Sequence, residues 1–222
     1  MFVSVFDMFK IGIGPSSSHT MGPMVAANNF LELMRSSPFN FAGVRCRLHG
    51  SLAFTGVGHA TDRAITLGLE GFTPENYDEV KASKALSRIQ STHFLEPDGL
   101  GKLKFNTSED LIFDYGPRLD EHSNGLILYA IDHQGDVILE EIYFSIGGGF
   151  ILTKSEFSQQ SPNEIGTEVP YPFKTAAEML QMARSSGKSI AEMKRDNEKA
   201  LHSNAEIKDC LLYTSDAADD CW

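Results

Sequence analysis

Apolar residues recur at helical spacing close to the N-terminus of this chain. Four of them fall on one face of a helix: Met24, Ala27, Leu31 and Met34. The pattern predicts an amphipathic helix that begins near Met21 and ends at Ser36-Ser37-Pro38, because proline disfavours helical backbone in the residue before it. The apolar run from Phe2 to Phe9 predicts a strand ahead of this helix.

Alternation of apolar and polar residues begins at Val44. Positions 44, 46 and 48 are apolar and the positions between them carry arginine, which predicts a half-buried strand with Cys46 as a small core residue. A helix is predicted around Ala64 to Leu69, and a weaker helical pattern runs from Asp78 to Ile89. The remaining strand candidates are Leu103–Phe105, Leu111–Phe113 and a hairpin of Leu126–Ile131 with Val137–Phe144.

The C-terminal part is helical after a proline-containing linker, residues 168–173. Two helices are predicted, about 175–185 and 189–202, with Gly187 between them and a capping box of Ser189 and Glu192. Asn197 falls on the apolar face of the second helix, so we expect it to bond a partner in the sheet domain or in another domain. From Cys210 onward there is no periodicity, and the sequence resembles translated read-through of a sequencing adaptor.

These elements predict an α/β (α+β) fold with a mixed β-sheet and helices. We expect three parts: a domain over residues 1–157, a linker with helices over residues 158–209, and a non-native tail over residues 210–222. Such a chain is long enough to bury a substantial core, and 41% apolar with 22% charged residues is typical of a globular protein.

Two glycine-rich turns carry the candidate chemistry. The first, Gly12 to Pro23, places three serines, an imidazole and a threonine at a helix start, where unpaired N–H groups favour a carboxylate or phosphate: Ser16, Ser17, Ser18, His19 and Thr20. Ser17, Ser18 or Thr20 could cap the helix. The alternative is a long capping loop with a surface histidine.

The second glycine-rich turn, Gly50 to Asp62, follows the predicted strand at 44–48. It contains His59 and Thr61 and again precedes a helix. If both turns lie at the same edge of the sheet, His19 and His59 come together. Downstream, the glycines at 147, 148 and 149 predict either a β-bulge or a close backbone approach to a ligand.

Charge and cysteine content narrow the function classes. The net charge is −11 and no lysine or arginine cluster occurs, which argues against nucleic acid or an anionic membrane as partner. We find neither an apolar run of about 18 residues nor a signal peptide. Three scattered cysteines (Cys46, Cys210, Cys221) without a C-x-x-C pair indicate no disulfide framework and a reducing, cytoplasmic setting. They would not by themselves ligate an iron–sulfur cluster.

The chain resembles the β region of iron–sulfur-dependent bacterial L-serine dehydratases (L-serine ammonia-lyases). The segments that carry the resemblance are Ser4–Lys10, Gly12–Pro23, Gly50–Leu52, Gly58–Asp62, His122–Gly125, Tyr143–Phe150 and Val169–Phe173. The helix from Ser189 to His202 resembles the segment that joins this region to a catalytic, all-helical α region. By resemblance, the fold is similar to the allosteric substrate-binding domain of some phosphoglycerate dehydrogenases, and the sequence stops before the α region.

The resemblance implies deamination of L-serine to pyruvate and ammonia, as in serine catabolism and gluconeogenesis. It also implies a [4Fe–4S] cluster held by cysteines of the α region, with no metal ligands in this chain, no pyridoxal phosphate and a homodimer. His19 and His59 would then be the acid–base or carboxylate-orienting groups. The substrate pocket would be lined by Ser16, Ser17, Ser18, Thr20, Thr61, Ser145, Gly147, Gly148, Gly149, His122 and Asn124.

A second hypothesis belongs to another class. The same hydroxyl-rich loop at a helix start would serve a non-catalytic regulatory domain that binds serine or a small anion. The sequence that follows residue 209 would discriminate the two, because a helical region with several cysteines favours the lyase and a dehydrogenase domain favours the regulator. A structural α/β domain without a ligand is the third reading.

Overall fold

The computed structural model describes residues 4–8, 12–159, 169–173 and 175–219. The chain forms two compact units, Ile11–Gln159 and a second unit in which Met1–Lys10 joins Gln160–Trp222. Within the described residues, none of the helices is both long and apolar enough to cross a membrane.

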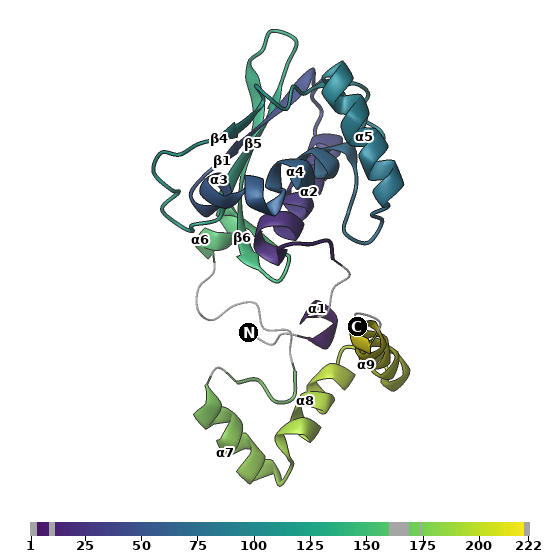
Figure 1. Cartoon of the computed structure of the whole chain (residues 1–222). Coiled ribbons are helices and arrows are strands. Elements are labelled where there is room, and N and C mark those ends of the chain that lie inside the picture. The colour runs from purple at the N-terminus through teal and green to yellow at the C-terminus, as the bar shows by residue number, and fades with distance from the viewer. Residues whose placement is uncertain (1–3, 9–11, 160–168, 174, 220–222) are drawn as a thin grey trace. The chain divides into compact units, whose positions relative to one another are not determined.

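The first unit is built on a mixed sheet of seven strands (Figure 1). They are β1 (Gly43–Leu48), β2 (Phe94–Leu95), β3 (Leu103–Lys104), β4 (Leu111–Phe113), β5 (Gly125–Ile131), β6 (Val137–Gly147) and β7 (Phe150–Thr153). The order is β2-β3-β1-β5-β6-β7, with β4 also paired to β1. Strand β1 runs parallel to β3 and β4 and antiparallel to β5, and β5, β6 and β7 are antiparallel in turn. The predicted mixed sheet and the hairpin are confirmed.

Helices cover one face of this sheet, and α2, α4 and α5 gather on the same side of it (Figure 1). The helical elements of the unit are η1 (Ser17–Met21), α2 (Gly22–Ser36), α3 (Ser51–Thr55), η2 (Val57–His59), α4 (Thr61–Glu70), α5 (Glu79–Thr92) and α6 (Lys154–Gln159). The predicted helices near 21–36, 64–69 and 78–89 are therefore present.

The core lies between the helices and the inner face of β1 and β5. Val44, Cys46 and Leu48 are fully buried, whereas the arginines between them are partly exposed on the opposite face. Burying an apolar side chain of this size contributes about 1.5–3 kcal/mol, so the alternation determines which face the helices cover. Burial also raises the pKa of the Cys46 thiol, and the interpretation of Cys46 as a core residue is confirmed.

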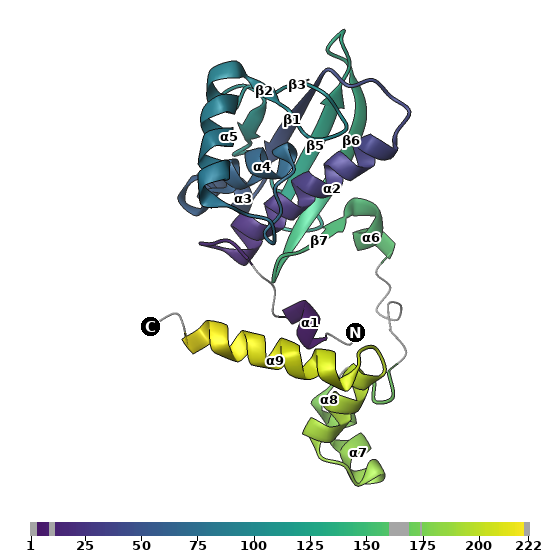
Figure 2. The ribbon, with the colours of Figure 1, turned by 90° about the vertical axis from the view of Figure 1, so that its right-hand side faces the viewer.

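The second unit contains α1 (Val5–Met8), α7 (Ala176–Ser186), α8 (Ile190–Lys199) and α9 (Asn204–Asp219), which Figure 2 shows from a second direction. The strand predicted for Phe2 to Phe9 is wrong where it can be judged, because Val5–Met8 is helical and the ends of the run lie outside the described residues. The Glu198 carboxylate accepts from the Ser4 hydroxyl (2.7 Å) and the Val5 N–H (2.9 Å). An anion at a helix start satisfies N–H groups that a strand would have paired in a sheet.

The capping box of Ser189 and Glu192 is confirmed. The expectation for Asn197 is wrong, because its partner is the main chain of the linker in its own unit. The Asn197 side chain accepts from the Tyr171 N–H (2.8 Å) and donates to the Tyr171 carbonyl (2.9 Å). The sequence shows no periodicity after Cys210, yet α9 continues through Asp219. The non-native origin of residues 210–222 stays a prediction.

Candidate functional site

The turn that carries His19 is a single π-helical turn, η1. The N–H groups of Thr20 and Met21 both reach the Ser16 carbonyl, at 3.0 and 3.1 Å, which accommodates one residue more than a regular helix start. The Ser16 hydroxyl accepts from the His19 N–H (3.2 Å), so Ser16 is the cap rather than Ser17, Ser18 or Thr20. Such π turns are frequent at functional sites.

Two threonines join the His19 turn to the His59 turn reciprocally. The Thr20 hydroxyl donates to the His59 carbonyl (2.8 Å), and the Thr61 hydroxyl donates to the His19 carbonyl (2.6 Å). Both threonines are buried, at 2% and 0% exposure. Each threonine therefore fixes the backbone of the other turn's histidine, and both hydroxyls are committed to main-chain acceptors.

The imidazoles of His19 and His59 lie side by side, with ring centroids 4.9 Å apart and ring planes inclined by 39°. The predicted convergence is confirmed, but not through two strand-to-helix turns of one sheet. Residues Val5–Met8 belong to the other unit, and the histidines meet because they precede α2 and α4, two helices that pack together. A pair of imidazoles held in this way can share one small ligand.

Hydrogen bonds hold the two rings unequally. His19 Nδ1 lies 2.9 Å from the Ser18 hydroxyl, and His19 Nε2 lies 2.9 Å from the Ser51 hydroxyl. His59 Nδ1 lies 2.9 Å from the Thr55 carbonyl. Burial lowers the pKa of His19, and His59 lowers it further, while a hydrogen bond to the Ser51 main chain acts in the opposite direction. The lowered pKa favours the neutral form of His19, which has one N–H and one lone pair.

Ser145 and Asn124 lie beneath the His19 turn. Ser145 is fully buried with its hydroxyl against Gly22, where a side chain would collide with it. Asn124 binds the Ser145 main chain at two points. Its side-chain Nδ2 donates to the Ser145 carbonyl (3.1 Å), and its main-chain carbonyl accepts from the Ser145 N–H (2.9 Å). Their predicted contact with a ligand stays a prediction.

The three glycines at positions 147, 148 and 149 form the turn between β6 and β7. All have positive φ, at 95°, 61° and 74°, and the strand register shifts between Ser145 and Gly147. A Cβ on Gly149 would lie 2.5 Å from the Met21 methyl group, so this turn packs on the end of η1. The β-bulge is present. The backbone of this turn also makes a close approach, and the group that it approaches is the Met21 side chain of the same chain.

His122 and Ser17 stand apart from the imidazole pair. His122 Nδ1 accepts from the Asn124 N–H (3.0 Å), and its ring lies 6.4 Å from that of Phe157. Ser17 is exposed on η1. The structure thus brings Ser16, Ser18, Thr20 and Thr61 around the two histidines and leaves these two predicted residues at the periphery.

Ser51 contacts His19 and was not among the predicted site residues. Its position depends on Gly50, which has φ = 55° and approaches the Ser123 carbonyl so closely that a Cβ would collide with it. The Ser51 N–H donates to that same carbonyl (2.8 Å). The sequence signal was a Gly-Ser pair directly between a buried strand and a helix.

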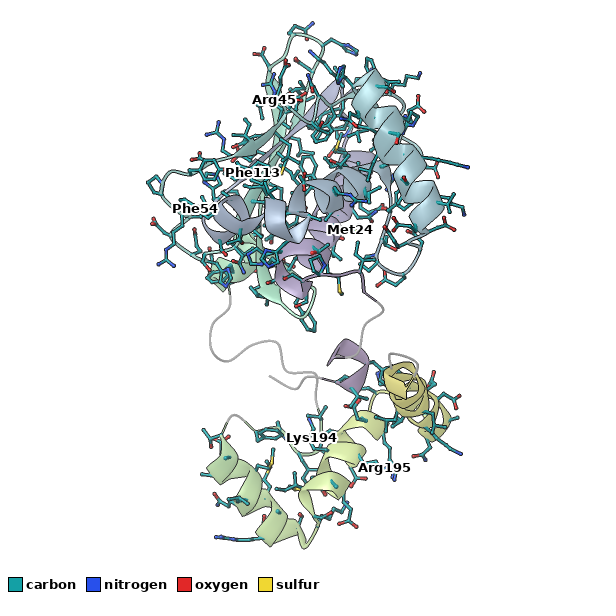
Figure 3. All side chains as sticks on the ribbon, viewed as in Figure 1. Met24, Arg45, Phe54, Phe113, Lys194 and Arg195 are labelled. Carbon is teal, nitrogen blue, oxygen red and sulfur yellow. The ribbon has the colours of Figure 1, made fainter. Side chains whose placement is uncertain are left out.

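An exposed apolar rim borders the His59 turn. Phe54 and Val57 are 64% and 69% exposed, and the Phe54 ring meets that of Tyr115 at 5.3 Å. Figure 3 shows Phe54 projecting from the end of the unit that carries α3. Since exposed large apolar side chains are more frequent at interaction sites than elsewhere, the rim marks a surface suited to a further polypeptide.

Two other features lie away from the histidines. A hollow of about 530 Å³ opens on the outer face of the sheet, lined by residues that include Arg45, Arg47, Lys104 and Tyr129, and none of the predicted site residues borders it. Across the described part of the chain, no cluster of three or more His, Cys, Asp or Glu residues could hold a metal ion.

Comparison with known protein families identifies the family of this chain. A sequence model described as serine dehydratase beta chain matches residues 4–156. The chain belongs to the serine dehydratase beta-chain family. The matched residues include both glycine-rich turns, the histidine pair and β6 of this chain.

The curated proteins that are similar to this chain are named L-serine dehydratases. The protein of that name from Streptomyces coelicolor is 39% identical over 214 residues, covering 96% of this chain and 47% of the relative. The Helicobacter pylori protein is 37% identical over 210 residues, covering 95% and 46%. L-serine dehydratase 1 of Escherichia coli is 37% identical over 223 residues, covering 99% and 48%. The chain thus spans about half the length of these relatives.

Proposed function

We propose that this chain forms the substrate-holding half of an L-serine ammonia-lyase, which converts L-serine to pyruvate and ammonia. The observation that carries the proposal is the imidazole pair, 4.9 Å apart and braced by reciprocal threonine bonds. Support comes from relatives named L-serine dehydratase. A rigid pair of imidazoles suits removal of a proton from carbon, because imidazole is a common general base in enzymes.

The chemistry can be divided among the chain's own groups. One imidazole accepts the Cα proton of L-serine, and the electrons of the Cα–H bond form a Cα=Cβ double bond as hydroxide leaves Cβ. The aminoacrylate product then takes up water and yields pyruvate and ammonia. The hydroxyl groups around His19 orient the substrate carboxylate, which holds the Cα–H bond near the base.

A [4Fe–4S] cluster, when bound, supplies a Lewis acid for the departing hydroxide. Because the described residues offer no ligand set for it, we place its ligands in the region that the relatives carry beyond the match. The chain's residues then bind, orient and deprotonate the substrate. We also propose that pyridoxal phosphate takes no part.

The partner of this chain is the region or subunit that corresponds to the other half of the relatives. The exposed Phe54 and Val57 beside the His59 turn support a site that this second region completes. L-serine is the proposed substrate. A homodimer, a cytoplasmic location and roles in serine catabolism and gluconeogenesis complete the proposal.

A chimera tests the proposal. Residues 1–209 replace the matching region of the Streptomyces coelicolor L-serine dehydratase, and pyruvate formed from L-serine is measured under anaerobic conditions, with the parent enzyme as positive control. We expect turnover that is specific for L-serine. A chimera that unfolds cooperatively and binds L-serine without forming pyruvate would overturn the lyase and favour the regulatory domain.

A further inference from the structure

The hydrogen bonds around His19 form a chain that runs from Ser16 through Ser18 to the ring. The Ser16 hydroxyl accepts from the His19 N–H and lies 3.4 Å from the Ser18 hydroxyl. The Ser18 hydroxyl in turn lies 2.9 Å from His19 Nδ1. Since a neutral imidazole has one donor and one acceptor, a proton donated by Ser18 to Nδ1 requires the ring proton to be on Nε2.

The opposite side of the ring agrees with this tautomer. His19 Nε2 lies 2.9 Å from the Ser51 hydroxyl, which can accept the Nε2 proton in this tautomer. With the Nε2 proton donated to Ser51, the Ser51 hydroxyl keeps its own proton for another acceptor.

His59 has the opposite tautomer. Its Nδ1 faces the Thr55 carbonyl at 2.9 Å, so Nδ1 carries the proton and Nε2 carries the lone pair. Among the described residues, no hydrogen bond occupies that Nε2. The two neighbouring rings therefore offer a ligand one basic nitrogen, from His59, and one hydroxyl proton, from Ser51.

We propose that Ser51 is a substrate-binding residue that donates a hydrogen bond to the substrate carboxylate, while His59 Nε2 accepts the Cα proton. His19 is then a positioning residue that fixes the direction of the Ser51 hydroxyl. This inference rests on the proposed function, since it assigns roles within the same site. Gly50 and the Ser123 carbonyl hold Ser51 in place, which connects the 122–125 turn to the site.

The first test reads the tautomers on the full chain. Nitrogen NMR of ring-labelled histidines distinguishes a protonated ring nitrogen from one with a lone pair. We expect the proton on Nε2 of His19 and on Nδ1 of His59 at neutral pH. A His19 ring protonated on Nδ1 would overturn the assignment of Ser51 as the donor to substrate.

The second test is a binding titration of the full chain with L-serine and with L-serinamide, which lacks the carboxylate. Ser51→Ala should weaken L-serine binding by about ten- to a hundredfold, the range for a hydrogen bond to a charged group, and leave L-serinamide binding unchanged. Ser51→Thr, which keeps the hydroxyl, should restore most of the affinity for L-serine. Ser83→Ala, the same change on the exposed face of α5, is the matched control.

The outcomes separate the two proposals. Equal L-serine affinity in the wild-type chain and Ser51→Ala overturns the role of Ser51 and leaves the proposed function standing. Equal losses for L-serine and L-serinamide identify Ser51 as structural only and also overturn its role. A wild-type chain that binds no L-serine overturns this inference together with the substrate-holding function.

Discussion

The two histidine turns of this chain begin from similar sequences and end in different geometries. Each carries a histidine followed shortly by a threonine, and each precedes a packed helix. Yet the His19 ring is held at both nitrogens, by Ser18 and Ser51, whereas the His59 ring is held at one, by Thr55. A ring held on both sides keeps its orientation and transmits a hydrogen bond, while a ring with an open nitrogen can exchange a proton with a ligand.

The difference originates in the backbone of each turn. His19 lies within a π-helical turn capped by Ser16, which directs its ring toward the start of α3. His59 ends a short 3-10 turn and precedes Ala60, which has φ = 53° and is the N-cap of α4. The two similar motifs therefore hold their rings differently, because one turn is π-helical and the other is followed by a residue with left-handed backbone.

The largest expected effect concerns the two imidazoles themselves. In the chimera, His59→Gln should reduce the rate of pyruvate formation about 10²–10⁴-fold, because it removes a general base. His19→Gln should cost less, since glutamine still offers a donor and an acceptor to Ser18 and Ser51. The measurement is pyruvate release at saturating L-serine.

His133→Gln, an exposed change in the hairpin turn, controls for the substitution itself and should retain the parent rate. If His19→Gln is the more damaging of the two site variants, the assignment of the base to His59 is wrong and the roles of the turns are reversed.

Much of the scaffold could be predicted because its signals are local. Alternation at 44–48 and the hairpin of β5 with β6 are visible in the sequence, since burial of one sheet face repeats every second residue. The helix at Val5–Met8 could not be predicted, because the carboxylate that holds its start belongs to Glu198, far along the chain. A short apolar run is ambiguous until such a partner is known.

The approach of the two histidines could be predicted, whereas the contacts that hold them could not. The repeated glycine-rich turns indicated that His19 and His59 would meet, and they do. The reciprocal bonds of Thr20 and Thr61 and the contact with Ser51 could not be predicted, because the partner of a hydroxyl depends on which loops pack together. Thr20 and Thr61, expected to line the pocket, have hydroxyls committed to the main chain.

A smaller effect is expected where the two turns are joined. Thr20→Val and Thr61→Val keep the side-chain shape but leave a buried carbonyl without its donor, so each should lower the free energy of unfolding by about 1–3 kcal/mol. Urea unfolding of the full chain measures this. The double variant should cost less than the sum, because either loss loosens the same junction.

Thr92→Val is the matched control, because Thr92 is exposed at the end of α5 and should change stability by less than about 0.5 kcal/mol. Additive losses in the double variant would contradict the idea that the two threonines brace one junction, and each turn would then be stabilised on its own.

The smallest expected effect is a dependence of stability on pH that belongs to the His19 turn. Burial and the neighbouring His59 lower the pKa of His19 from its ordinary 6.5. Below that ordinary value the unfolded chain takes up a proton that the folded chain resists, so stability falls as the pH drops from about 7 to 5. His49, whose pKa burial also lowers, acts in the same direction.

His19→Gln should therefore flatten this pH dependence in part, with the contribution of His49 remaining, while above about pH 7 the slope is unchanged. Urea unfolding of the wild-type chain and the variant at several pH values measures the difference. If the free energy of unfolding changes with pH equally in the wild-type chain and in His19→Gln, the folded chain accepts a proton on His19 as readily as the unfolded chain does. Burial would then not restrict protonation of His19, and the proposed division of roles between the two turns would not hold.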